Sequence, residues 1–314
     1  MNTNVVFQQN ETPPVRREMI FKDGAISYLE WKLREGLPAL HFAHANGFNA
    51  MTYRHLLAPL AQHFHIRAWD TRGHGFTTLP ADPAKHANGY LYRDDLISFI
   101  EPFAAETGGP ILLAGHSMGG SISLLTAADR PDLVRGIFLA DPVMAPTFRR
   151  RLRLSFGRLL GRKSDPLLMS EIAGRRRAVY ADRATMADSY KGRGAFRTWP
   201  EEMIADYVEG GTVDLADGQV GLACAPAMEA ANFHMQSLRI QSQSIWEALH
   251  KLEVPLSLIY AGQHSTCLEP TPRIFGERDP QAVLLRLGQA THFLTMEFPD
   301  ITRREILALH ARLG

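Results

Sequence analysis

The sequence predicts an α/β fold, a mostly parallel eight-stranded sheet flanked by helices. Short apolar runs alternate with longer segments of helical periodicity, and Gly, Pro and Asp residues bound the runs. The chain has 314 residues, of which 45% are hydrophobic and 21% charged, so it can bury a full core. The alternation stops after Asp141-Pro142 and resumes near Pro255, which predicts an insertion.

The first half of the sheet follows from local patterns. Two opening strands, 19–21 and 26–33, are joined by Asp23-Gly24, a strong hairpin signal. Residues 111–114 are continuously apolar, as expected for a strand buried on both faces. The other expected strands are 39–43, 65–69, 136–140, 256–260 and 283–287.

Helices are expected between these strands, since parallel neighbours need crossover connections. Leu56, Leu57 and Leu60 fall on one face of the first helix, 52–63. The other expected helices are 92–106, 118–128 and 299–313. Residues 144–253 are Arg-rich and helical in pattern, and we expect them to form a cap over a core domain made of 1–143 and 254–314.

A candidate nucleophile lies between a strand and a helix. Residues Gly115 to Gly119 read Gly-His-Ser-Met-Gly, with the strand 111–114 before them and the helix 118–128 starting within them. This is the context of a nucleophile elbow, where a strained turn exposes a serine and small residues must flank it. A Gly-rich turn with a helix-capping serine is the structural alternative. The context favours Ser117 as the nucleophile.

A serine hydroxyl needs a base, and His292 follows the last predicted strand, 283–287. It is therefore expected at the same sheet edge as Ser117, where a neutral imidazole can accept the serine proton. The loop 44–48 follows the strand 39–43 and is expected to help form an oxyanion hole. The expected N–H donors are those of Phe48 and Met118, and His44 is expected to brace the loop.

Residues 70–75 read Asp-Thr-Arg-Gly-His-Gly after the strand 65–69. A dinucleotide-binding reading fails because the third glycine is missing and no helix is expected there. We expect a tight turn held by a pair between Asp70 and Arg72.

Taken together, the loop 44–48, residues 70–75, the elbow and His292-Phe293 make the chain resemble the α/β-hydrolase superfamily from about residue 19 to 313. The resemblance implies a Ser, acid, His triad in that order, with a helical cap inserted after the sixth strand. It usually places the acid shortly after the strand that follows the cap, where this chain has Ser265. A serine cannot stabilise the imidazolium. Some members of the superfamily supply the acid from the end of the strand before the cap, so the resemblance implies Asp141, which ends the strand 136–140, as the acid. Glu269 and a dyad without a carboxylate remain alternatives.

Several function classes are not favoured by the composition. The two cysteines, Cys224 and Cys267, are too few for a disulfide framework and form no Cys-x-x-Cys pair. The histidines show no metalloprotease pattern, so no metal and no cofactor are expected. No apolar run approaches the roughly 18 residues of a spanning helix, and no signal-peptide pattern opens the chain. A cytoplasmic protein is expected.

The formal net charge of +1 hides a local asymmetry. Residues 148–177 hold ten Lys or Arg and two Asp or Glu, a net +8, which leaves −7 for the remainder. Apolar residues recur at helical spacing between the arginines of 148–160, which predicts an amphipathic basic helix. A solvated cap helix is the simplest interpretation; attraction of an anionic small-molecule substrate or contact with an anionic membrane surface are alternatives. Nucleic acid is not an expected partner.

The resulting hypothesis is a cofactor-independent serine hydrolase that cleaves a carboxylic ester or a related acyl bond through an acyl-enzyme. A carbon-carbon bond hydrolase with the same triad is an alternative. A non-catalytic binding protein on this fold is a second alternative, because Ser265 stands where the acid is usual.

Overall fold

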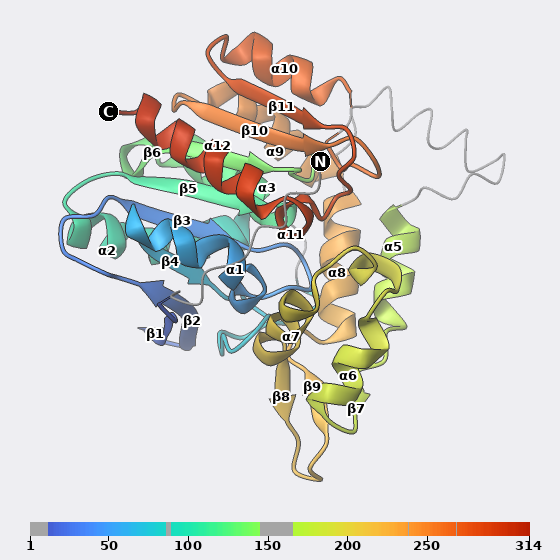
Figure 1. Ribbon diagram of the computed structural model, residues 1–314. Helices are drawn as coiled ribbons and strands as arrows, with labels where there is room; N and C mark the ends of the chain where they lie inside the picture. Colours follow the sequence, from blue (N-terminus) through green and yellow to red (C-terminus); the bar gives the residue numbers. More distant parts are fainter. Residues whose placement is uncertain (1–11, 86–88, 145–165, 238, 268) are drawn as a thin grey trace, which may run out of the picture.

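The computed structural model describes residues 12–85, 89–144, 166–237, 239–267 and 269–314. At its centre is an eight-stranded sheet in the order β1-β2-β4-β3-β5-β6-β10-β11, which confirms the predicted fold (Figure 1). The strands are β1 (Val15–Phe21), β2 (Gly24–Trp31), β3 (Ala39–Ala43), β4 (His65–Trp69), β5 (Ile111–His116), β6 (Val134–Ala140), β10 (Leu256–Ala261) and β11 (Val283–Leu287).

Strand β2 runs opposite to the other seven strands of the sheet. The β1–β2 and β2–β4 pairs are antiparallel, and the pairs from β4 to β11 are parallel. The β1–β2 turn is tight, since Phe21 pairs with Gly24, as the Asp23-Gly24 signal predicts. The parallel strands end at one edge, so the loops that follow β3, β5, β6 and β11 are brought together there.

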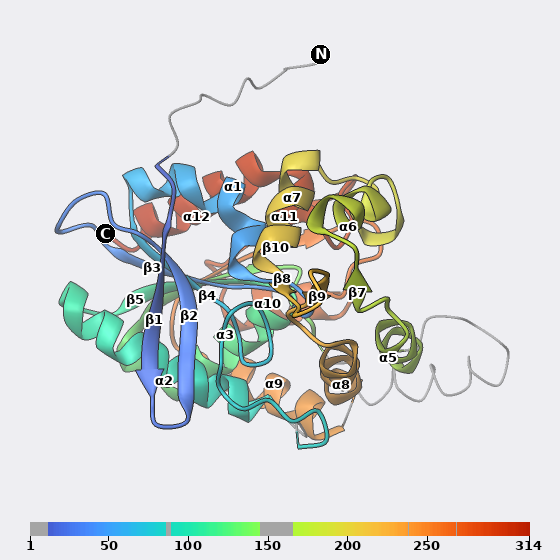
Figure 2. The ribbon, with the colours of Figure 1, turned by 90° about the horizontal axis from the view of Figure 1, so that it is seen from below.

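Helices cover both faces of the sheet (Figure 2). On one face lie α2 (Tyr90–Thr107), α3 (Met118–Asp129) and α9 (Arg239–Lys251); on the other lie α1 (Arg54–Leu57) and α12 (Pro299–Arg312). Two shorter helices, α10 (Thr271–Arg278) and α11 (Leu294–Glu297), follow β10 and β11.

One expected helix is wrong in its detail. Residues 52–63 do not form a single α-helix but lie in the 3₁₀ turn Ala50–Tyr53, the short α1 and the 3₁₀ turn Ala58–Gln62. Pro59, at the start of the last turn, has no N–H to continue an α-helix. The apolar face is still as expected, because Leu56, Leu57 and Leu60 are buried.

Most of the described elements between β6 and β10 gather on one side of the sheet (Figures 1 and 2). Its elements are α5 (Pro166–Gly174), β7 (Val179–Tyr180), α6 (Arg183–Tyr190), a 3₁₀ turn (Gly194–Phe196), α7 (Glu201–Gly210), β8 (Thr212–Asp214), β9 (Val220–Leu222), α8 (Pro226–Ser237) and α9. The strands form a small sheet ordered β7-β9-β8. Helix α9 packs on α3 in the layer beneath the main sheet. The division at residues 143 and 254 stays a prediction, and the expected basic helix 148–160 lies outside the described residues.

Three buried histidines should make the fold acid-sensitive. His41, on β3, packs its ring edge-to-face against Trp69 and Phe99 at centroid distances of 5.4 and 5.3 Å. Burial lowers the pKa of His41 to about 3, of His44 to about 4 and of His116 to about 3. An unfolded imidazole has a pKa of about 6.5, so below this pH the unfolded chain binds protons that the folded chain excludes.

The free energy of unfolding is therefore expected to be fully retained above about pH 6.5 and to fall as the pH drops toward 4. Each of the three histidines should contribute a slope of about 1.4 kcal/mol per pH unit in that window. Urea unfolding at a series of pH values measures the slope. In His41→Leu the slope of the unfolding free energy against pH should be smaller by about 1.4 kcal/mol per pH unit. An unchanged slope would contradict the contribution of His41.

Candidate active site

Ser117 is the single residue between β5 and α3, in the strand-turn-helix context predicted for it. Its backbone has φ 56° and ψ −119°, in the left-handed region that side chains rarely adopt. The Ser117 N–H donates to the carbonyl of Ala140 at the end of β6 over 3.0 Å. Strained backbone that the surrounding structure holds in place is concentrated at functional sites.

The glycines flanking Ser117 are required by close backbone contacts. A Cβ on Gly115 would lie 2.5 Å from the carbonyl oxygen of Gly119. A Cβ on Gly119 would lie 2.2 Å from the carbonyl oxygen of Ala43 on β3. These are backbone atoms, which cannot move aside as a side chain can. Gly115 is therefore needed for the tight turn from strand to helix, and Gly119 for the close approach of the elbow to β3.

Gly119→Ala is expected to lower the free energy of unfolding by about 3 kcal/mol or more, at the upper end for overpacking. Gly109→Ala is the matched control, because a Cβ on Gly109 meets nothing within 4 Å. Guanidinium unfolding of both variants measures the effect. Equal stabilities of the two variants would contradict the close approach of elbow and β3.

Three sequence-predicted side chains form an unbroken hydrogen-bonded chain. Ser117 Oγ lies 2.9 Å from His292 Nε2, and His292 Nδ1 lies 2.6 Å from Asp141 Oδ2. A carboxylate can only accept, so the Nδ1 of a neutral His292 carries the proton and Nε2 accepts from the serine. His292 follows β11 and Asp141 follows β6, so the three residues come from three neighbouring strand ends.

The Asp141 carboxylate is fully buried and held on both oxygens. Oδ1 accepts from Ser265 Oγ over 2.5 Å and from the Ala261 N–H over 3.0 Å, and Oδ2 accepts from the Thr266 N–H over 2.9 Å. Burial alone would raise the pKa of Asp141, but His292, Ser265 and Thr266 together hold it below the ordinary value. The carboxylate is thus kept ionised beside the imidazole.

Ser265 and Glu269 have different relations to the Asp141–His292 pair. Ser265 is adjacent to the carboxylate and donates to it, so it supports Asp141. Among the residues that the structure describes, the carboxylate hydrogen-bonded to His292 Nδ1 is that of Asp141 and not that of Glu269. Asp141 also has positive φ, 41°, a second strained residue at this site.

The two predicted oxyanion donors differ in the hydrogen bonding of their backbone N–H groups. Met118 is the first residue of α3, where backbone N–H groups have no partner within the helix. The Phe48 N–H instead donates to the carbonyl of Ala45 over 3.1 Å. The bond closes the Asn46-Gly47 turn, and Phe48 must share or release it to act as a second donor.

The loop 44–48 is braced at both ends, as expected for His44. His44 Nδ1 donates to the Ala45 carbonyl over 2.7 Å, and its Nε2 accepts from the Thr71 N–H over 2.9 Å. The Gly47 N–H donates to His74 Nε2 over 3.1 Å. Residues 70–75 thus hold the loop 44–48 in place through these hydrogen bonds.

The expected pair between Asp70 and Arg72 is wrong. Asp70 instead accepts from Arg16 over 2.9 Å and from the Ala50 N–H over 2.8 Å. Arg72 pairs with Asp95 on α2 at 2.7 Å. The chain turns tightly here as expected, but the two side chains point to different neighbours, and both partners are distant in the sequence.

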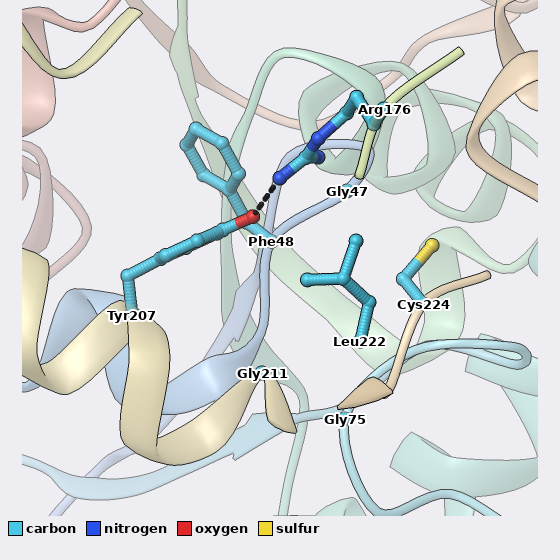
Figure 3. A pocket seen from close by; sticks show the side chains of 8 residues that line it. All are labelled: Gly47, Phe48, Gly75, Arg176, Tyr207, Gly211, Leu222 and Cys224. Carbon is cyan, nitrogen blue, oxygen red and sulfur yellow. Dashed lines mark hydrogen bonds between the residues drawn. The ribbon is translucent and has the colours of Figure 1, made fainter. Parts of the chain in front are cut away.

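A small pocket lies between the loop 44–48 and the segment between β6 and β10 (Figure 3). Its free space of about 210 Å³ includes open solvent and leaves no room for an enclosed water molecule, and Gly47, Phe48, Arg176 and Tyr207 are among its lining residues. Arg176 donates to the Tyr207 hydroxyl over 2.8 Å and pairs with Glu229 at 2.5 Å. The positive charge of this arginine is therefore compensated within the protein.

In the part of the chain that the structure describes, no group of three or more His, Cys, Asp or Glu side chains is arranged to hold a metal ion. No helix in these residues is both long and apolar enough to cross a membrane.

A comparison with protein families supplies the identification. The model of the alpha/beta hydrolase family matches residues 42–305, most of the chain. The chain belongs to this family.

The matches to curated relatives each cover only part of the chain. A 2-(acetamidomethylene)succinate hydrolase of Mesorhizobium japonicum is 35% identical over 104 residues, 33% of this chain and 35% of the relative. The human monoglyceride lipase is 29% identical over 141 residues, 42% of this chain and 46% of the relative. The chain thus spans less than half the length of either relative.

Solved structures extend the likeness in fold to nearly the whole alpha/beta hydrolase chain. The crystal structure of E-2-(acetamidomethylene)succinate hydrolase has a TM-score of 0.74 at 20% identity, covering 95% of this chain and 99% of that one. A thioesterase domain from the curacin biosynthetic pathway also has a TM-score of 0.74, at 18% identity, covering 94% and 100%.

Sequence reasoning missed several residues of this alpha/beta hydrolase site. Thr266 holds Asp141, and Tyr53 and His116 connect the loops around Ser117. His116 lies inside the elbow motif, so its position was a usable signal. Tyr53 is 63 residues away from it and carried no such signal.

Proposed function

We propose that this chain is a serine hydrolase that cleaves a carboxylic ester or a closely related acyl bond through an acyl-enzyme intermediate. The observation that carries the proposal is the hydrogen-bonded chain from Ser117 Oγ through His292 to Asp141. Nucleophilic acyl transfer needs a hydroxyl, a base within reach of it and a group that orients the base.

In the first half-reaction, Ser117 Oγ attacks the substrate carbonyl carbon and its proton passes to His292 Nε2. The developing oxyanion is stabilised by the Met118 N–H, with the Phe48 N–H as the second donor once it is shared with or freed from Ala45. The Asp141 carboxylate stabilises the imidazolium that forms. His292 then protonates the leaving group as the carbonyl re-forms.

In the second half-reaction, water takes the place of the leaving group. His292 Nε2 removes a proton from the water, whose oxygen attacks the acyl carbon. The tetrahedral species collapses, the proton returns to Ser117 Oγ and the carboxylic acid leaves. Each step uses groups of the chain and water.

Two further observations support the proposal. The names of the partial relatives describe hydrolysis of an acetamidomethylene succinate and of a monoglyceride. The Asp141 carboxylate beside His292 favours catalysis over a non-catalytic binding protein, the alternative that rests on Ser265 at the usual place of the acid.

A panel of p-nitrophenyl esters of increasing acyl length tests the proposal. We expect turnover of at least one ester, with a pre-steady-state burst of p-nitrophenol that matches the enzyme concentration when deacylation is slow. Turnover without any acyl-enzyme, shown by rapid quench and mass measurement, would contradict the acyl-enzyme route. Absence of turnover for every ester and for matched anilides would contradict the acyl-bond class.

A further inference from the structure

Three segments of the site are connected by one buried chain of hydrogen bonds. The Ala45 N–H, in the loop 44–48, donates to the hydroxyl oxygen of Tyr53 over 3.1 Å. The Tyr53 hydroxyl lies 2.8 Å from His116 Nδ1, in the elbow. His116 Nε2 lies 2.8 Å from the backbone carbonyl oxygen of His292. The chain thus joins the loops that hold the oxyanion donors, the nucleophile and the base.

The direction of every bond in this chain is determined by chemistry. The His292 carbonyl can only accept, so His116 Nε2 carries a proton and donates it. The Nδ1 of the neutral ring then accepts from the Tyr53 hydroxyl, whose oxygen accepts from Ala45. Burial lowers the pKa of His116 to about 3, so the ring stays neutral at ordinary pH. Tyr53 is 1% and His116 0% exposed, so water does not compete for these bonds.

We propose that Tyr53 and His116 are positioning residues that hold the oxyanion loop, the elbow and the loop of His292 in one fixed arrangement. This inference rests on the proposed function, because it assigns the pair a role in presenting Ser117 to His292. His116 precedes Ser117 in the chain, and its ring donates to the backbone carbonyl of His292. The ring of His292 is the group that accepts the serine proton. A small misplacement of either group can reduce a rate about a hundredfold.

The Tyr53 ring offers a clean way to remove the connection. It packs against Phe42 and Phe48 at centroid distances of 4.6 and 6.4 Å. Tyr53→Phe keeps this ring and deletes the hydroxyl, which leaves the Ala45 N–H and His116 Nδ1 without their shared partner. The change therefore removes the link between the two loops and little packing.

The rate of covalent labelling by a fluorophosphonate probe is the readout, because it reports the reactivity of Ser117 without a known substrate. In Tyr53→Phe we expect labelling to be slower by tenfold to a hundredfold. Thr302→Val is the matched control, since it deletes a buried hydroxyl of α12 that donates to the carbonyl of Phe298, the N-cap of that helix, and belongs to none of the three connected segments. The control should label within about twofold of the parent even if both variants lose similar thermal stability.

A second readout separates this inference from the proposed function. The His292 Nδ1 proton bound to Asp141 is expected to give a low-field proton resonance, which should broaden in Tyr53→Phe and persist in Thr302→Val. If the parent protein labels and Tyr53→Phe labels at the same rate, the positioning role is overturned. If the parent does not label at all, the proposed function fails, and an unchanged resonance in Tyr53→Phe then overturns the positioning role independently.

Discussion

Asp141→Asn is expected to lower kcat for ester hydrolysis by about four orders of magnitude, the loss that follows removal of the carboxylate from a comparable triad. The amide keeps the shape of the side chain but cannot stabilise the imidazolium, and it can present its NH₂ group to His292 Nδ1 in place of an acceptor. Steady-state kinetics with an active ester, at constant pH, measure the effect. KM should change little, because Asp141 is fully buried and does not reach the substrate.

Two companion variants show whether the acid has been assigned to the right residue. Ser265→Ala removes one of the hydrogen bonds to Asp141 Oδ1 and leaves that of the Ala261 N–H, so we expect a loss of about tenfold. Glu269→Gln should leave kcat within about twofold. A full loss in Glu269→Gln together with an active Asp141→Asn enzyme would overturn the assignment.

Ser117→Ala should have the largest effect, a loss of about six orders of magnitude in kcat, because no other group can form the acyl-enzyme. His292→Ala should lose a similar amount, and the double variant should be no worse than either single one, since the two act as a unit. Ser98→Ala, an exposed serine on α2, is the control for serine removal. Losses that simply multiply in the double variant would indicate that Ser117 and His292 act separately.

The fold was predictable because its signals are local. Most strands of the main sheet contain a short apolar run, and the Asp23-Gly24 turn specifies a hairpin on its own. The elbow was predictable for the same reason, because its tight turn and close contacts require glycine at positions 115 and 119. Pro59 argues against one continuous helix over 52–63, whereas the spacing of the apolar residues alone predicts one.

The side-chain partners were harder to predict, because they depend on contacts between distant segments. Asp70 pairs with Arg16, 54 residues away, and not with its close neighbour Arg72. The partner of Ser265 is Asp141, 124 residues away, so the sequence could name both residues without showing that one supports the other. The turn bond from Phe48 to Ala45, by contrast, is marked in the sequence, because Asn46-Gly47 at the centre of the turn is a strong turn signal.

Intact-mass measurement after incubation with a fluorophosphonate probe shows whether Ser117 is an activated nucleophile. We expect one adduct per chain, located by peptide mapping on the segment that contains Ser117. Labelling should disappear in Ser117→Ala, slow strongly in His292→Ala and persist in Ser98→Ala. Equal labelling of Ser117→Ala and the parent, or an adduct on another residue, would contradict the role of Ser117 as the activated nucleophile.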